Sequence, residues 1–86
     1  MQDKSTKEWA KNEACKIIRT EAPKYYFQFD NAKRRAGCCD YRRKRISLSG
    51  YFTEHNNKTE VMNTILHEVA HALAGARAGH EPTIRC

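Results

Sequence analysis

The sequence predicts an α+β fold in which an N-terminal helix precedes a small antiparallel three-stranded sheet and a second long helix. Three patterns predict this order: helical spacing of apolar residues before Pro23, alternation of aromatic and polar residues after it, and a second helical pattern after Asn57. The chain has 86 residues, and we expect a single domain over residues 5–86. A chain this short is close to the size at which a metal or a partner usually adds stability.

The first helix is predicted over residues 5–21. Ser5 and Glu8 have capping-box spacing, which satisfies two backbone N–H groups at a helix start. Pro23 disfavours helical geometry at Ala22, so the helix should end at Glu21. The residues that recur at helical intervals, and that should pack inward, are Trp9, Ala10, Ala14, Ile17 and Ile18.

Three strands are predicted over residues 25–30, 37–42 and 45–49. In the first, Tyr25, Phe27 and Phe29 alternate with polar positions, as in a strand with one buried face. These aromatic side chains could stack on nucleic-acid bases, but the alternation favours packing in the core. The connections are short, so we expect an antiparallel meander in which residues 45–49 form an exposed edge.

The second helix should begin near Asn57 or Thr59, where Asn57 and Glu60 have the spacing of a helix cap. Gly75 or Gly79 should end it. Its apolar stripe is predicted to consist of Met62, Ile65, Leu66, Val69 and Leu73.

The segment from His67 to His71 has the pattern H-E-x-x-H. On a helix, residues four apart lie on one face, so the two imidazoles can present nitrogens to a single zinc ion. Glu68 would lie beside the metal as a general base without ligating it. The pattern therefore predicts a Zn²⁺ site with catalytic chemistry.

A catalytic zinc site needs a third protein ligand and an open position for water. His80 is the preferred candidate because imidazole is the commonest zinc ligand, and Glu81 is the second. His55 belongs to a polar segment and should be exposed to solvent. Arg77 and Tyr51 are weak candidates for stabilising an oxyanion.

The chain is basic, with 16 Lys and Arg against 10 Asp and Glu. A surplus of this kind either favours a polyanionic partner such as DNA or is an ordinary solvated surface. The candidate nucleic-acid contacts are Lys33, Arg34, Arg35, Arg42, Arg43, Lys44 and Arg45.

The composition also bounds the location of the protein. No apolar run approaches the roughly 20 residues of a membrane span, and the first residues lack a signal-peptide pattern. The cysteines form no C-x-x-C pair, so we expect free thiols rather than a zinc ribbon or a disulfide framework. We expect a cytoplasmic monomer, with association to the nucleoid if DNA is a partner.

These motifs resemble the SprT-like zinc peptidase domain, which includes bacterial SprT proteins, phage relatives and the DNA-dependent protease Spartan. The resemblance runs through residues 31–41, Arg45–Ser49, Leu66–Leu73 and the pair Gly79-His80. It implies a minimal zincin-like core in which His67, His71 and His80 are zinc ligands and Glu68 is catalytic. Glu81 stands where the family often has Gly, and the family's further C-terminal helix is not expected within this chain.

The sequence and the resemblance together predict a zinc metallopeptidase that hydrolyses peptide bonds, with protein or peptide substrates that include DNA-associated proteins. Two alternatives stay open. One is a nucleic-acid-binding module with a structural zinc, and the other is a catalytically silent zinc-binding scaffold.

Overall fold

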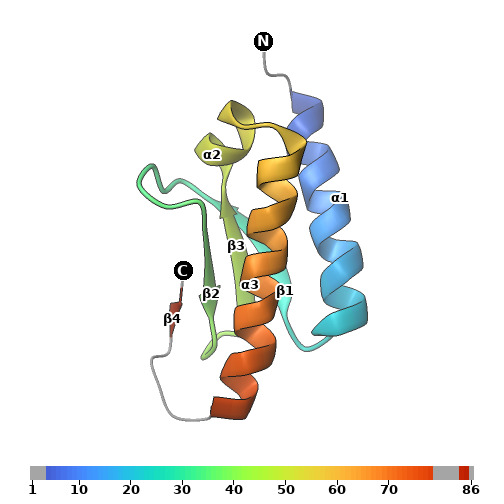
Figure 1. Cartoon of the computed structure of the whole chain (residues 1–86), viewed down its shortest axis with the longest axis vertical. Helices are drawn as coiled ribbons and strands as arrows, with labels where there is room; N and C mark the ends of the chain where they lie inside the picture. Colours follow the sequence, from blue (N-terminus) through green and yellow to red (C-terminus); the bar gives the residue numbers. More distant parts are fainter. Residues whose placement is uncertain (1–3, 79–83, 86) are drawn as a thin grey trace.

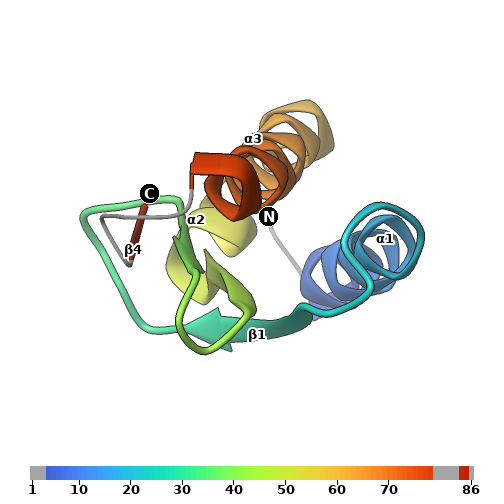
Figure 2. The same cartoon turned by 90° about the horizontal axis from the view of Figure 1, so that it is seen from below.

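A computed structural model describes residues 4–78 and 84–85. Helices α1 (Lys4–Glu21) and α3 (Lys58–Ala78) lie side by side on one face of a sheet formed by β1 (Tyr26–Asp30), β3 (Arg45–Ser49) and β2 (Gly37–Asp40) (Figures 1 and 2). The short helix α2 (Gly50–His55) follows β3, and the two-residue strand β4 (Ile84–Arg85) extends the sheet beyond β2. The fold is therefore α+β, as predicted.

The sheet is mixed rather than antiparallel, with the order β1-β3-β2-β4. β1 pairs with β3 in parallel, Phe27 opposite Ile46, whereas β2 pairs with β3 as an antiparallel hairpin. The prediction of a meander was wrong because residues 31–36 do not form a hairpin turn. This connection is long enough to cross two strand spacings of about 4.8 Å each, so β3 inserts between β1 and β2. β3 is consequently an internal strand, and the predicted sheet edge at residues 45–49 does not exist.

The core lies between the sheet and the two long helices. Ile46 and Leu48 of the central strand are almost completely buried, and Tyr25, Phe27 and Phe29 pack at its border while Tyr26 is exposed. The aromatic alternation thus assigns the faces of β1 as predicted. The helical residues of the core are Ala10, Ala14, Ile18, Val61, Ile65, Val69 and Ala72.

The buried face of α3 differs from the predicted stripe. Ile65 and Val69 are buried, but Leu66 and Leu73 are 48% and 46% exposed. Val61 and Ala72, together with Glu68, occupy the buried face instead. Helical periodicity identified two of the core positions, but the hydrophobicity of the leucines shifted the predicted centre of the stripe toward solvent.

The structure contains one helix that the sequence patterns missed. α2 has only six residues, too few to show a period, and it begins directly after β3. Ser49 caps it: the Ser49 hydroxyl accepts a hydrogen bond from the backbone N–H of Phe52 at 3.0 Å. The sequence signal that could have predicted this helix was Ser49, a residue type that often caps helices, followed by a polar and aromatic segment.

Candidate metal and catalytic site

The candidate site lies on the middle of α3. Its first turn is fixed by Asn57, whose side-chain oxygen accepts a hydrogen bond from the backbone N–H of Glu60 at 2.9 Å. This contact confirms the predicted cap. Val61, Ile65 and Val69 then anchor the helix to the core, which fixes the rotation of the helix and the direction of every other side chain on it.

His67 and His71 point their imidazoles toward each other on one face of α3. Their Nε2 atoms are 3.0 Å apart, and the rings meet nearly at right angles, with centroids 4.4 Å apart. Two nitrogens bound at 2.0–2.1 Å to one tetrahedral zinc would be separated by about 3.4 Å. The pair therefore has the spacing that a shared metal ion requires with only a small adjustment.

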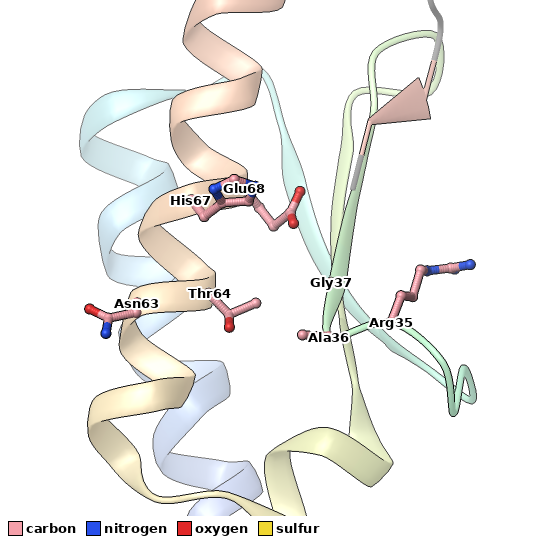
Figure 3. A pocket seen from close by; sticks show the side chains of 7 residues that line it. All are labelled: Arg35, Ala36, Gly37, Asn63, Thr64, His67 and Glu68. Atoms are coloured by element: carbon pink, nitrogen blue, oxygen red, sulfur yellow. The ribbon is translucent and has the colours of Figure 1, made fainter.

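Glu68 points the other way around the helix, toward the strand β2 (Figure 3). Its side chain is 1% exposed, and no residue in the described part of the chain donates a hydrogen bond to its buried Oε1 atom. Burial raises the pKa of Glu68 from 4.5 to about 7, while Arg35 acts in the opposite direction. A buried carboxyl oxygen without a partner is an acceptor held ready for a proton or for a ligand that donates one.

Gly37 at the start of β2 allows the strand to approach Glu68 closely. A Cβ atom at Gly37 would lie 3.1 Å from Cγ of Glu68 and 3.2 Å from Cγ2 of Thr64, and 3.0 Å from the carbonyl oxygen of Ser47. Any side chain there would push the strand and α3 apart. Gly37 is a site residue that sequence reasoning missed, because the signal, a glycine inside a predicted strand, has its meaning only once the opposing helix is known.

A cavity of about 320 Å³ opens between α3 and the start of β2, directly beside Glu68. It extends from the imidazole of His67 toward the preceding turn of the helix (Figure 3). The residues that line it are Arg35, Ala36, Gly37, Asn63, Thr64, His67 and Glu68.

Tyr41 covers α3 one turn beyond His71. A Cβ atom at Gly75 would lie 2.3 Å from a ring carbon of Tyr41, so the ring rests directly on the helix backbone. Gly75 does not end the helix, as one prediction had it, because α3 continues to Ala78. The second expected helix end, Gly79, lies outside the described residues.

Some of the candidate site residues lie outside the part of the chain that the structure describes. His80 and Glu81, the candidates for the third ligand, lie outside the described residues, as does the side chain of Arg77. In the described part of the chain, no group of three or more His, Cys, Asp or Glu residues could hold a metal ion. His67 and His71 could supply two of the ligands that a zinc site needs, and their role as ligands, like the third ligand, stays a prediction.

Tyr51 and His55 lie apart from the imidazole pair of His67 and His71. Both are exposed on α2, where their rings stack at 4.2 Å, and the Nδ1 atom of His55 lies 2.8 Å from the Tyr51 carbonyl oxygen. α2 lies where α3 begins (Figure 1), and nine residues of helix, about 14 Å, separate that end from His67. His55 is solvent-exposed as predicted, and Tyr51 is too far from the imidazole pair to stabilise an oxyanion there.

The seven candidate nucleic-acid contacts do not form one cluster. The loop cluster, Lys33, Arg34 and Arg35, precedes β2, and the turn cluster, Arg42, Arg43 and Lys44, follows it. The four residues of β2, about 13 Å, lie between the two groups. Arg45 is half-buried on β3, and its guanidinium lies 3.8 Å from the Asp40 carboxylate.

The cysteines and helices of the described residues bear on the remaining expectations from composition. Within the described part of the chain, Cys15, Cys38 and Cys39 form no disulfide, and burial raises the pKa of Cys39 to about 12. Among the helices that the structure describes, none is long and apolar enough to cross a membrane.

Comparison with known proteins identifies a family. The model of the SprT-like family matches residues 6–84. No curated protein and no solved structure matches the sequence.

Proposed function

The chain belongs to the SprT-like family, and from this premise we propose that it is a zinc-dependent peptidase. One observation carries the proposal: α3 presents two converging imidazoles and, between them in the sequence, a buried carboxylate. A helix that only packs in a core does not bury a glutamate with an unpartnered oxygen beside an open cavity.

His67 and His71 would hold the metal through their Nε2 atoms, and His80 is the proposed third ligand. Zinc, when bound, supplies a Lewis acid that polarises the scissile carbonyl and lowers the pKa of water. Zinc accepts carboxylate as well as imidazole ligands, so Glu81 stays the second choice for the third ligand.

Glu68 is the proposed general base. Its side chain lines the cavity, and its carboxyl group can accept a proton from the attacking water, then transfer it to the leaving amine. The buried position serves this role because a carboxylate whose pKa lies near the working pH both accepts and releases a proton readily. The peptide would enter between α3 and the start of β2, where the cavity lies.

The proposal that the substrates are DNA-associated proteins depends on DNA binding by the basic residues. The loop cluster adjoins exposed aromatic rings, since the Lys33 ammonium lies 6.0 Å from the ring of Tyr51, which stacks on His55. Cationic and aromatic groups side by side suit a single-stranded nucleic acid. A nucleic-acid-binding module without catalysis is therefore the alternative function.

Metal analysis of histidine variants tests the proposal. His67→Ala and His71→Ala should each lose zinc, whereas His55→Ala should retain it, because His55 is an exposed histidine of the same chain on another helix. Hydrolysis of casein should follow the zinc content of the variants. Equal zinc content in the parent protein and all three variants would exclude the imidazole pair as the metal site.

A further inference from the structure

The cavity beside Glu68 continues past the reacting groups. Asn63 and Thr64 lie one helical turn before His67 and Glu68, and the segment 35–37 faces them across the gap (Figure 3). If the scissile bond of a peptide lay at Glu68, the side chain next to that bond would lie over the part of the cavity between Thr64 and residues 35–37. The lining of that part therefore decides which side chains fit.

Thr64 presents a methyl group to the cavity, not its hydroxyl. The hydroxyl donates a hydrogen bond to the carbonyl oxygen of Glu60 at 3.0 Å, within α3. The methyl carbon Cγ2 then faces β2, 3.2 Å from where a Cβ of Gly37 would lie. Ala36 and Gly37 form the opposite wall and carry no polar side-chain atoms, so the centre of the cavity is apolar.

The charged groups at the cavity oppose each other. The carboxylate of Glu68 lies on one side, and Arg35 lies on the other, with its guanidinium bonded to Asp30 at 3.1 Å. An acidic side chain in the cavity would lie near Glu68, and a basic one would lie near Arg35. Each would also lie near the oppositely charged group, so the two charges favour neither sign. Either charged side chain would lose solvation against the apolar centre, which favours an uncharged occupant.

We propose that the cavity is a specificity subsite that binds an uncharged, apolar side chain of the substrate next to the cleaved bond. This rests on the proposed peptidase function, since the subsite has meaning only beside a reacting centre. Its volume of about 320 Å³ is at the lower end for ligand pockets and suits one large side chain, such as that of leucine or phenylalanine. Thr64, Ala36 and Gly37 set its width.

Binding measurements test the subsite without requiring turnover. Dipeptide hydroxamates with Gly, Leu, Phe, Asp or Lys beside the metal-binding group are titrated calorimetrically into the zinc-loaded protein. The Leu and Phe compounds should bind at least about tenfold more tightly than the Gly compound, since burying an apolar side chain contributes that much. The Asp and Lys compounds should bind no better than the Gly compound.

Two variants locate the effect in the cavity. Ala36→Leu should fill the space and abolish the preference for Leu and Phe over Gly. Thr64→Ser removes only the wall methyl and keeps the hydroxyl, so the preference for Leu over Gly should fall by about two- to fivefold. The matched control is Thr20→Ser on α1, where the threonine hydroxyl makes the same bond to the residue four positions earlier, Lys16, at 3.1 Å.

A second measurement separates this inference from the peptidase proposal. N-acetylated amides of the same five residues are titrated into the metal-free protein, and the NMR signal of the Thr64 methyl group is followed. Leucine and phenylalanine amides should shift it, and the glycine, aspartate and lysine amides should not. Side-chain discrimination without any hydrolysis would sink the peptidase proposal and leave the cavity as an apolar binding site without a cleavage role. Hydrolysis with equal binding of all compounds, or equal shifts from all amides, would overturn the subsite alone.

Discussion

Glu68 occupies a position where an ionised carboxylate is costly. It is 1% exposed, and among the described residues its Oε1 atom receives no hydrogen bond. Burial is the main cause of its raised pKa, and the opposing charge of Arg35 offsets only part of the effect. In the metal-free protein, the folded state therefore prefers the protonated form of this side chain.

This preference makes the stability of the metal-free protein depend on pH. The pKa of Glu68 rises from 4.5 to about 7 on folding, so its favourable contribution is complete below pH 4.5 and is lost as the pH rises through 7. The loss amounts to at most roughly 3 kcal/mol. Glu68→Gln should therefore unfold at higher urea concentration than the parent protein at pH 8, and at a similar concentration at pH 4.5, both in EDTA.

Glu60→Gln is the matched control for that measurement, because Glu60 is exposed on the same helix. It should change the urea midpoint little at either pH. A pH 8 midpoint for Glu68→Gln that is equal to or below that of the parent protein would contradict the burial argument.

At the scale of single residues, local periodicity predicted that the two imidazoles meet, but it predicted no other contact of the site. Residues four apart on a helix share a face whatever the rest of the fold does, so the meeting of His67 and His71 could be predicted. The burial of Glu68 and the close approach of Gly37 could not, because both depend on β2 passing over α3. That contact joins residues about 30 positions apart, and no local pattern encodes it.

At the scale of elements, the contact between the β2–β3 turn and α3 fixes the end of the helix near the site. Tyr41 rests on Gly75, where even a methyl group would meet the ring at 2.3 Å. The turn itself is held by Asp40, whose carboxylate accepts hydrogen bonds from the backbone N–H groups of Arg42 and Arg43, both at 3.1 Å. The ring position is thus set by both elements.

Gly75→Ala should destabilise the protein. The added methyl group must displace the tyrosine ring, which costs about 1–3 kcal/mol and exceeds the roughly 1 kcal/mol that alanine gains over glycine in a helix. Thermal unfolding of Gly75→Ala, Tyr41→Ala and the double variant measures this. Once the ring is absent the substitution should become neutral or stabilising, so additive effects of the two changes would show that the contact is not the cause.

The order of the strands shows what element patterns could not predict. The strands β1 and β3 were recognised within one residue at each end, yet their parallel pairing was missed. Strand register depends on where residues 31–36 take the chain, and here Ser49 and Ala36 join through a backbone hydrogen bond of 2.8 Å that places β3 in the centre. The exposed leucines of α3 show the same limit, because hydrophobicity alone does not say which side of a helix faces the sheet.

At the scale of the whole molecule, six of the seven candidate nucleic-acid contacts are divided between the two ends of β2. The loop cluster and the turn cluster each carry three cationic residues, and they lie at opposite ends of the hairpin (Figure 1). Two separate clusters cannot neutralise the same few phosphates of a short strand. Each cluster should therefore contribute to DNA binding on its own, and weakly.

Fluorescence anisotropy on single-stranded DNA at two salt concentrations measures these contributions. Replacing the loop cluster with serine should lower both the affinity and its salt dependence, because phosphate contacts release counterions in proportion to their number. Replacing the turn cluster should also lower the affinity, since its Lys44 ammonium lies 5.9 Å from the ring of Tyr25. Affinity that neither replacement lowers, or affinity that does not change with salt, would remove DNA as a partner.

The central claim is that α3 carries a hydrolytic zinc site in which Glu68 moves the proton. The most direct measurement is the rate of casein hydrolysis by the zinc-loaded protein and by Glu68→Gln at equal zinc content, with Glu60→Gln as the control. We predict that Glu68→Gln keeps its zinc and loses at least about 100-fold in rate, because an amide cannot accept the proton, while the control hydrolyses at the parent rate. Hydrolysis by Glu68→Gln at the parent rate, or no hydrolysis by the zinc-loaded parent protein, would contradict the claim.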